Sequence, residues 1–455
     1  MHDLRKKALI ESGKTLSRKA RSRESTPGHS KLNTPASSRA ASRVRGAGSR
    51  AVSDDENDGD LSDETSHSTG SIDEVLNGDI QISGGQLADR IEEIFARKGS
   101  TILGREKCYK TYAHLLAIRY SEEDIRGKED ELVAAFLRSI KEERSEKEAV
   151  LAAKAIALTI VTSPSDMIYD AAAEPLQRAI IHSKSTLTKA AAIRALSVCA
   201  FYGGASEDDI FKTMEFFMEI VTSDGHTISA PDEPEPVVAA LEEWGFLCTM
   251  MDEMSPYSED AVEAFVEQLS SSYAAVQIAA GENIALLYEK SFRASASPGE
   301  ESPGEFAESD IITDPDEEDN PSAPKMLRLY PAYRRTDQLL HTLNSLSRNN
   351  MLSVHQISKE DRKAVKTNFT DIANSIEYPH RGPKYSNAIN EENGSRYGSR
   401  MTVKINKEGT MRIDRWWKLH RLKGLRRVLQ SGFVEHYEKN EVVFDTLPIM
   451  MTRDG

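Results

Sequence analysis

Two adjacent tryptophans stand inside a strongly basic segment near the C-terminus, which reads TMRIDRWWKLHRLKGLRRVLQSGFVEHYEKNEVVFDTLPIMM from Thr410 to Met451. Between Lys404 and Arg427 there are nine lysines and arginines against two acidic residues, a local charge of +7 in a chain whose formal net charge is −15. Guanidinium and ammonium groups bind phosphates, and a tryptophan among them can stack on a nucleic-acid base. These residue types therefore predict contact with a polyanion.

Placed on a helix at about 100° per residue, the segment separates into two halves. The apolar half holds Ile413, Trp417, Leu422, Leu425, Val428 and Leu429, with Arg421 intruding. The basic half holds Arg412, Arg415, Lys418, Lys423, Arg426 and Arg427, with Trp416 among them. We predict that Trp417 is buried and that Trp416 is presented with the arginines. The alternative is that both tryptophans are core residues and the basic half is a solvated face.

No pattern for catalysis or for a cofactor is present. The sequence has no Walker loop, GxGxxG, HExxH or GxSxG motif and no Cys/His metal spacing. His420 and His436 lie in or near the basic segment, but no cysteine or third histidine accompanies them, so we expect no metal site. The prediction is a protein that is not an enzyme and that has no cofactor and no small-molecule substrate.

Charge is segregated along the chain. Residues 1–50 carry +10, residues 51–80 carry −10, residues 81–324 carry about −25 and residues 325–455 carry +10. Such asymmetry indicates that any nucleic-acid contact uses the basic ends, while the acidic middle faces proteins or water.

Residues 1–80 are rich in Ser, Gly, Pro and charge, so we predict a disordered region, basic and then acidic, in which residues 1–19 could form a short helix. A basic run there could be a phosphate-binding arm, a nuclear-import signal or a solvated tail; it contains Arg18, Lys19, Arg21 and Arg23. Hydroxyls beside acids or prolines are candidate phosphorylation sites, namely Ser53, Ser62, Thr26 and Thr34.

Three cysteines, Cys108, Cys199 and Cys248, lie far apart in apolar helical patterns, which is typical of buried thiols in a reducing compartment. No apolar run approaches the length of a membrane span, and the N-terminus lacks a signal core. We therefore expect a soluble protein with no membrane partner, located in the cytoplasm, with the nucleus as a second location.

Residues 81–292 consist of repeated amphipathic helices with small-residue cores. Five alanines that mark equivalent positions, Ala113, Ala153, Ala192, Ala240 and Ala280, are 40, 39, 48 and 40 residues apart. A period near 40 with paired helices is typical of armadillo and HEAT repeats. We predict an α-solenoid of about five repeats over 81–292; a compact helical bundle is the alternative.

The remaining segments follow from composition. Residues 293–324, with ten acids, are a predicted disordered linker; residues 325–378 continue the helical pattern; residues 379–400, rich in Pro, Gly and Asn, are a predicted loop. Residues 401–455 are a predicted C-terminal domain in which a small hairpin around Lys407 precedes the basic tryptophan helix. The predicted fold class is all-α: an armadillo/HEAT-like solenoid, a small mainly helical C-terminal domain and long disordered segments.

The C-terminal segment resembles the C-terminal domain of the interferon-related developmental regulators, in which M-x-I-D-x-W is followed by His, V-L-x-S-G, His, Asn, Phe and L-x-P-x-M. The solenoid is similar to their N-terminal domain, chiefly in KEAVLAAKAIALTIV and AAVQIAAGENIALLYE, and SDDENDGDLSDETSHSTG resembles their acidic leader. The resemblance covers most of residues 51–292 and 359–451. It identifies a fungal-type member without the basic C-terminal tail of the animal proteins, because this chain stops at Gly455.

The resemblance implies an armadillo-like, non-enzymatic regulator of one of two kinds. One branch of the family binds idle ribosomes; the basic half of the tryptophan helix would then contact rRNA phosphates, Trp416 would stack, and residues 1–23 would replace part of the missing tail. The other branch is a nuclear transcriptional co-regulator that serves histone deacetylase complexes as a protein-binding adaptor. We favour the ribosome, its rRNA and its proteins as partner over chromatin-regulator proteins, because mere nuclear import does not require an aromatic residue inside the basic patch.

Overall fold

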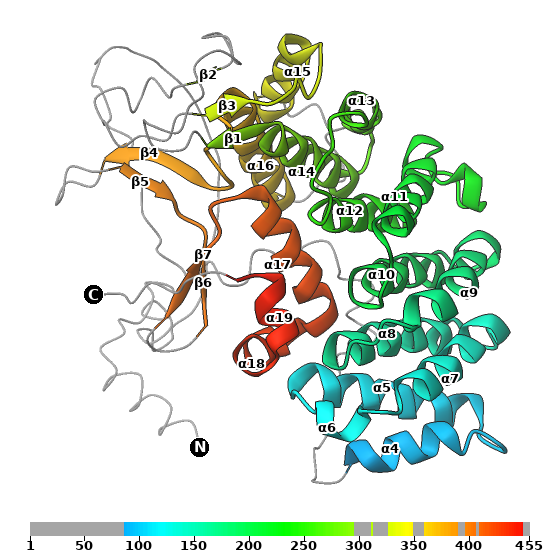
Figure 1. The fold of residues 1–455 in the computed structure, drawn as a ribbon. Helices are drawn as coiled ribbons and strands as arrows, with labels where there is room; N and C mark the ends of the chain where they lie inside the picture. Colours follow the sequence, from blue (N-terminus) through cyan, green and yellow to red (C-terminus); the bar gives the residue numbers. More distant parts are fainter. Residues whose placement is uncertain are drawn as a thin grey trace, which may run out of the picture. The chain divides into compact units, whose positions relative to one another are not determined.

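The computed structural model describes residues 86–294, 311–312, 326–348, 359–389, 396–405 and 409–448. All of them belong to one compact unit that spans Asp58–Gly455. The described residues form mostly α-helices, accompanied by three small antiparallel sheets (Figure 1). The predicted all-α class with an armadillo-like solenoid is confirmed.

The solenoid is a row of helix pairs. The inner helices, each in contact with the next, are α5 (Ile102–Ile118), α8 (Glu146–Thr162), α10 (Thr186–Tyr202), α12 (Pro234–Cys248) and α14 (Ala274–Lys290). The outer helices are α4 (Gln86–Phe95), α7 (Glu129–Glu142), α9 (Ile168–His182), α11 (Glu207–Thr222) and α13 (Ser258–Gln268). Two short elements, α6 (Glu122–Ile125) and η2 (His226–Ile228), lie in connections. A further pair, α15 (Thr336–Arg348) and α16 (Lys359–Glu377), extends the row beyond α14.

The alanine period has a direct structural meaning. Each of the five marker alanines lies on an inner helix and is at most 2% exposed. A methyl group at these positions lets successive inner helices approach closely, so the repeat length of the sequence is the length of one helix pair. The 48-residue gap contains η2 and the Pro-containing connection to α12.

Side-chain caps stabilise the starts of solenoid helices, and a buried ion pair joins two of the inner helices. Ser145 accepts a hydrogen bond from the backbone N–H of Glu148, and Ser185 does the same at the start of α10. At α11 Ser206 and Asp209 form a reciprocal capping box. Glu148 also accepts two hydrogen bonds from Arg105, at 2.7 and 2.9 Å, which joins the first two inner helices.

The C-terminal region begins with two hairpins and ends in three helices. Its elements are β4 (Tyr385–Ile389), β5 (Arg396–Ser399), β6 (Thr402–Lys404), β7 (Thr410–Arg412), α17 (Trp416–Leu429), η5 (Gln430–Gly432), α18 (Phe433–Lys439) and α19 (Glu441–Thr446). The predicted hairpin before the tryptophan helix is confirmed, with Thr402 opposite Arg412. The predicted loop over 379–400 is wrong at residues 385–389 and 396–399, where β4 and β5 pair.

The predicted linker, residues 293–324, also differs from the structure. Its described residues contribute to a three-stranded sheet whose strands are β1 (Phe292–Ala294), β2 (Ile311–Ile312) and β3 (Met326–Arg328). The central strand, β3, pairs with both others. The predicted disorder of 293–324 therefore fails at residues 293–294 and 311–312, which pair with β3.

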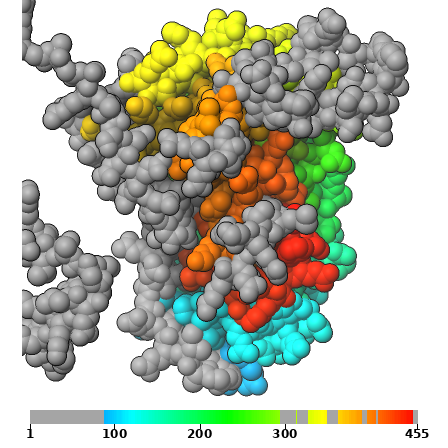
Figure 2. Space-filling model, turned by 90° about the vertical axis from the view of Figure 1, so that its left-hand side faces the viewer, coloured from blue at the N-terminus to red at the C-terminus, as the bar shows by residue number. Residues whose placement is uncertain are grey.

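Helices α17, α18 and α19 lie on the side of the solenoid that the inner helices form (Figure 1). Helix α17 contacts α12, α14 and α8, while α18 contacts α5 and α19 contacts α8. In Figure 2 the C-terminal region, orange to red, lies between the first solenoid helices in cyan and the last helix pair in yellow. The sequence left open whether the two regions pack together; they do, along most of the inner face.

Candidate functional site

The basic side of α17 faces carboxylates of the solenoid. Lys423 Nζ lies 2.6 and 2.7 Å from the two carboxylate oxygens of Glu282 on α14. Arg427 donates from Nε to Glu243 of α12 at 2.9 Å, and its Nη2 lies 2.8 Å from the same oxygen. The Arg427 side chain is only 8% exposed. Two residues predicted to contact phosphates therefore bind carboxylates inside the protein.

Both ends of α17 meet a charge of the favourable sign. Glu289, from the last turn of α14, accepts hydrogen bonds from the backbone N–H groups of Trp416 and Trp417 at 2.8 and 3.1 Å. At the other end Lys154 donates to the carbonyl oxygen of Arg427 at 3.5 Å. A carboxylate at the helix N-terminus and an ammonium at its C-terminus both complement the helix dipole. The solenoid thus fixes the direction in which α17 docks.

The prediction that Trp416 is presented is wrong. Trp416 is 1% exposed and ranks first by volume among the fully buried side chains of the described residues. Its indole Nε1 donates to Ser375 Oγ of α16 at 2.8 Å. Trp417, predicted to be buried, is only half-buried and contacts the guanidinium of Arg421 at 5.2 Å. Since Trp416 has no accessible face, it cannot stack on a base of a docked RNA.

Two glycines permit the close contact between α12 and α17. A Cβ on Gly424 would lie 2.6 Å from the ring of Phe246, and a Cβ on Gly245 would lie 2.5 Å from the His420 ring. Both distances are too short for any side chain. The neighbouring His420 accordingly sits within the interface, with Nε2 3.3 Å from the carbonyl oxygen of Glu282.

The following helices supply donors to the C-terminal ends of the inner helices. His436 Nε2 lies 2.8 Å from the carbonyl oxygen of Leu116, and Asn440 Nδ2 donates to that of Val161 at 2.8 Å. Arg421 Nη2 donates to the carbonyl oxygen of Thr249 at 3.1 Å. Carbonyls in a last helical turn have no partner within their helix. Donors from α17 and α18 therefore complete the hydrogen bonding of α5, α8 and α12.

The other predicted contact residues of the tryptophan helix have different environments. Lys418 pairs with Asp414 one turn away at 2.5 Å, and half-buried Arg415 donates to the carbonyl of Pro379 at 3.4 Å. Half-buried Arg426 lies over the Phe433 ring at 5.8 Å. Arg412 is exposed, but it lies on β7 and not on the helix. The candidates Arg18, Lys19, Arg21, Arg23, Thr26, Thr34, Ser53 and Ser62 lie outside the described residues.

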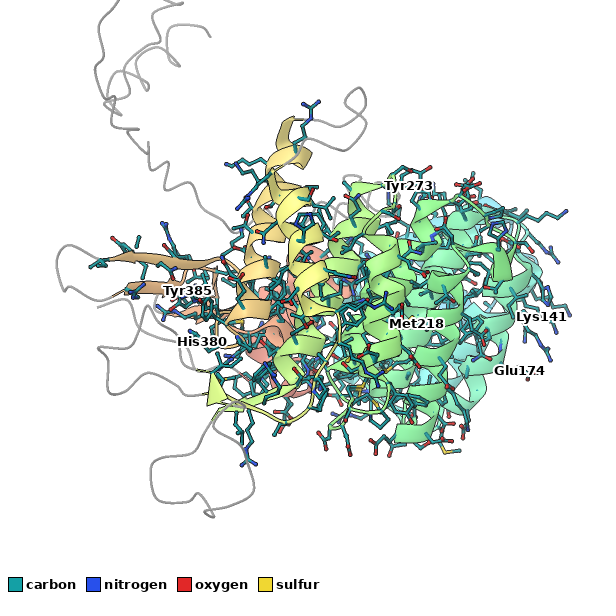
Figure 3. The ribbon with its side chains drawn as sticks, turned by 90° about the horizontal axis from the view of Figure 1, so that it is seen from above. Lys141, Glu174, Met218, Tyr273, His380 and Tyr385 are labelled. Atoms are coloured by element: carbon teal, nitrogen blue, oxygen red, sulfur yellow. The ribbon has the colours of Figure 1, made fainter. Side chains whose placement is uncertain are left out.

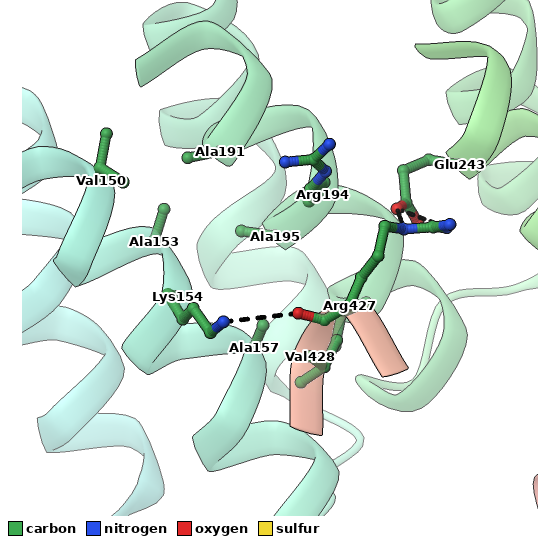
Figure 4. A pocket seen from close by; sticks show the side chains of 11 residues that line it. Val150, Ala153, Lys154, Ala157, Ala191, Arg194, Ala195, Glu243, Arg427 and Val428 are labelled. Atoms are coloured by element: carbon green, nitrogen blue, oxygen red, sulfur yellow. Dashed lines mark hydrogen bonds and ion pairs between the residues drawn. The ribbon is translucent and has the colours of Figure 1, made fainter. Parts of the chain in front are cut away.

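A small cavity remains where the end of α17 meets α8 and α10 (Figure 4). Its volume is about 40 Å³, its floor is made of alanine and valine side chains, and Lys154, Arg194 and Arg427 stand at its edge beside Glu243. A volume of this size holds one or two water molecules and no larger ligand. We therefore do not regard it as the functional site.

Most of the exposed basic residues described in the C-terminal region lie instead on the two hairpins. We call this the hairpin surface, and it consists of exposed Tyr397, Arg400, Lys404 and Arg412 together with half-buried Arg396. Tyr397 is 43% exposed, and the guanidinium of Arg400 lies over its ring at 5.5 Å. Residues 379–413 contain seven lysines and arginines and three acids, and none of the acids is among the described residues. An exposed aromatic ring among guanidinium groups suits single-stranded nucleic acid.

The β4–β5 hairpin is firmly held at its base and extends away from the helices (Figure 3). Asp371 of α16 accepts a hydrogen bond from the backbone N–H of Lys384 at 3.1 Å. Arg381 is buried, with its guanidinium 4.1 Å from the ring centre of Tyr378 and 5.3 Å from that of Tyr385. Ser399 donates to the carbonyl of Ile413, which ties this hairpin to the next one. The hairpin surface is therefore presented by a preorganised scaffold.

The sequence patterns do not predict most of the hairpin surface. Only Arg412 was among the predicted contact residues, because the prolines and glycines of 379–400 indicated a loop. The available signal was RYGSRMTVK, residues 396–404, in which a base recurs at every fourth position and Tyr, Thr and Val have high strand propensity. The segment around the tryptophan pair has the denser positive charge, but many of its basic residues form contacts inside the protein.

Buried histidines in this interface predict an acid-sensitive stability. Burial lowers the pKa of His420 to about 3, below its usual 6.5, and also lowers the pKa of His436. Protonation therefore favours the unfolded chain, and stability is lost as the pH falls below about 6.5. Between about pH 6.5 and 5.5 we expect His420 to contribute a loss of about 1 kcal/mol.

Urea unfolding of the wild type and of His420→Gln at these two pH values checks this prediction. Asp371, whose pKa burial raises to about 6, opposes the trend, because its protonation favours the folded state. The difference between the two proteins removes this common contribution. Identical pH dependence in both would contradict the assignment of a neutral, buried His420.

Burial raises the pKa of the Cys108 and Cys248 thiols to about 12, which keeps them protonated at neutral pH. Within the described ranges, no group of three or more His, Cys, Asp or Glu residues could hold a metal ion. None of the described helices is both long and apolar enough to cross a membrane.

Fold and surface together define a helical-repeat protein whose own C-terminal helices occupy the inner face and whose hairpins present basic residues. The family model described as Interferon-related developmental regulator (IFRD) matches residues 53–377, and the chain belongs to this family. The match ends at the last residue of α16, so the hairpins and α17–α19 lie beyond it.

A relative from Schizosaccharomyces pombe, an uncharacterized protein, is 29% identical over 238 residues. The aligned region covers 52% of this chain and 46% of that protein, so the chain matches less than half of its relative's length. The comparison agrees with a fungal-type member of the family.

Proposed function

We propose that this protein is a non-enzymatic regulator that binds ribosomes, through rRNA and ribosomal proteins, and keeps them in an idle state. The observation that carries the proposal is the hairpin surface, where exposed guanidinium groups and a tyrosine ring stand on a rigid support. Family membership supports a regulatory role, and a surface of this chemistry fits a single-stranded or irregular RNA segment. The function needs no catalytic residue and no cofactor.

The alternative function is that of a protein-binding adaptor in histone deacetylase complexes. It requires the solenoid to bind segments of other proteins, which usually lie along the inner face of such a repeat array. Here α17–α19 contact α5, α8, α12 and α14 of that face. Because the face is already covered, we favour the ribosome as partner and the cytoplasm as the main location.

Charge reversal on the hairpin surface tests the proposal. We expect the triple variant Arg396→Glu, Arg400→Glu, Arg412→Glu to lose co-sedimentation with 80S ribosomes at moderate salt. Each lost phosphate contact should also reduce the slope of log affinity against log salt by about 1. Arg400 and Arg412 are exposed and Arg396 is half-buried, so the thermal unfolding of the variant should resemble that of the wild type.

A matched control reverses the same number of charges elsewhere. Arg138, Lys141 and Lys184 are exposed, on or beside outer helices, and Figure 3 shows Lys141 at the opposite end of the view from Tyr385. Their triple replacement by glutamate should leave ribosome binding intact. Equal binding by both triple variants would remove the hairpin surface from the interface. A wild-type protein that co-purifies with deacetylase subunits and without ribosomal proteins would support the adaptor role instead.

A further inference from the structure

A second cavity opens at the start of α17, where this helix meets the ends of α12 and α14. Its volume is about 320 Å³, and it is lined by Thr249, Glu289, Lys290, Trp417 and Arg421. We call it the Trp417 pocket. Pockets that bind small ligands start at roughly 300 Å³, so this one is large enough for a nucleotide-sized group and several times larger than the cavity at the other end of the helix.

The pocket offers one flat surface, the indole of Trp417. The guanidinium of Arg421 lies over this ring, 5.2 Å from its centre, and over the ring of Phe201 at 5.6 Å, so it supports the indole from inside the fold. Arg421 is also fixed by hydrogen bonds to the hydroxyl and carbonyl of Thr249, at 3.0 and 3.1 Å. Aromatic rings and arginine planes are the surfaces on which unstacked bases of RNA lie. Since the indole is held in place, little conformational entropy is lost on binding.

The charges in the pocket favour an anion. Lys290 donates to the carbonyl oxygen of Met251 at 2.5 Å, which uses one of the three donors of its ammonium group. Glu289 is the acidic residue of the lining, and both of its oxygens accept hydrogen bonds from the N-terminus of α17. The positive end of the helix dipole therefore offsets this carboxylate. The ammonium of Lys290 and the guanidinium of Arg421 leave the pocket positive overall.

The neighbouring surface continues the same chemistry. Lys418 lies 5.8 Å from the Trp417 ring centre, and Arg415 precedes the helix. A protein segment carrying an acidic side chain would satisfy the charge, but it would not use the aromatic plane of Trp417. An RNA nucleotide uses both features, since its base can stack and its phosphate can approach Lys290.

We propose that the Trp417 pocket binds one unstacked base of a single-stranded RNA segment, with the adjoining phosphate against Lys290. This inference rests on the proposed function, because it takes RNA as the partner. It adds a base-binding site on the solenoid side of α17 to the phosphate-binding hairpin surface. Trp417, and not Trp416, is then the tryptophan that contacts the nucleic acid.

The probe is a fluorescently labelled single-stranded RNA decanucleotide of mixed sequence, and binding to the full-length protein is followed by anisotropy. We expect Trp417→Leu to weaken binding about fivefold or more, because one stacked base is lost, and Trp417→Phe to retain most of the affinity. Lys290→Gln should lower the salt slope by about 0.7. The matched control, Lys141→Gln, removes an exposed charge on the outer helix α7, away from the pocket lining, and its affinity should stay within twofold of the wild type.

A double-stranded RNA of the same sequence provides the second arm, because its bases are stacked and cannot enter a pocket. The wild type and Trp417→Leu should bind it equally. Equal binding of the single strand by both proteins, or an equal loss on both forms of RNA, would overturn the inference. The inference would also be overturned if a polyglutamate peptide, but not RNA, bound the protein in a way that depends on Trp417. That result would assign the pocket to an acidic protein partner.

Ribosome co-sedimentation separates the failure of this inference from that of the proposed function. If ribosomes bind through the hairpin surface but Trp417→Leu leaves single-stranded RNA affinity unchanged, the pocket assignment is wrong and the function stands. If single-stranded RNA binding depends on Trp417 while ribosomes do not bind, the pocket stands and the ribosome is the wrong partner.

Discussion

Replacing Arg427 by methionine lowers the free energy of unfolding by about 3–5 kcal/mol, the cost of leaving a buried charge without its partner. Glu243 is 2% exposed, and burial already raises the pKa of its carboxyl against the attraction of Arg427. Without the guanidinium, this buried carboxyl must either remain ionised with only the weaker attraction of Arg194 or take up a proton. Urea unfolding at neutral pH measures the loss.

The control is an ion pair of the same residue types on the surface. Arg178 pairs with Glu174 on α9, where both side chains are largely exposed, and Arg178→Met should cost under about 1 kcal/mol. Combining Arg427→Met with Glu243→Leu should recover most of the lost stability, because no unpaired charge remains. If Arg427→Met costs no more than Arg178→Met, α17 is not docked through this pair.

Trp416→Ala is the second large effect, with an expected loss of about 3–5 kcal/mol from the cavity that it leaves. The indole fills the junction between α17 and α16, and its loss also removes the hydrogen bond to Ser375. Chemical denaturation followed by circular dichroism gives the magnitude.

Trp417→Ala serves as the comparison at the adjacent position. This side chain is half-buried, so the same substitution should cost only about 1–2 kcal/mol. The order of the two losses distinguishes the structure from the arrangement that the helical wheel predicts, in which Trp417 is the buried residue. Equal losses, or a larger loss at Trp417, would contradict the packing described for α17.

The solenoid could be predicted from the sequence because its determinants are local and repeated. The alanines from Ala113 to Ala280 recur at the length of one helix pair, and each pair packs mainly on the next. The β6–β7 hairpin was predictable for the same reason, since its alternation and its turn lie within a few residues of each other.

The exposure of the tryptophans could not be predicted from the helix alone. A wheel assumes that a helix buries one side against one partner. Helix α17 instead packs across α12, α14 and α8, with Ser375 of α16 beside its first turn, so much of its basic half is enclosed as well. The partner of Trp416 is 41 residues away in sequence, and no periodicity within the helix indicates it.

The carboxylate partners of the basic residues of α17 could not be predicted for a similar reason. A count of lysines and arginines in α17 says nothing of Glu243, Glu282 and Glu289, which come from repeats more than a hundred residues earlier. In the sequence these acids are part of an acidic middle region; in the fold they neutralise the helix. A local charge of +7 therefore does not amount to an exposed polyanion-binding surface.

The bonds that α17–α19 make to the ends of the inner helices have a consequence for how the protein unfolds. In an ordinary solenoid each repeat touches only its neighbours, so repeats at one end can open while the rest stay folded. Here Leu116, Val161 and Thr249, from three different repeats, all bind one continuous C-terminal segment. Opening any one of these repeats breaks its hydrogen bond to the C-terminal segment, and this weakens the attachment of the segment to the other repeats. A nearly one-dimensional chain of repeats thereby becomes a single cooperative folding unit.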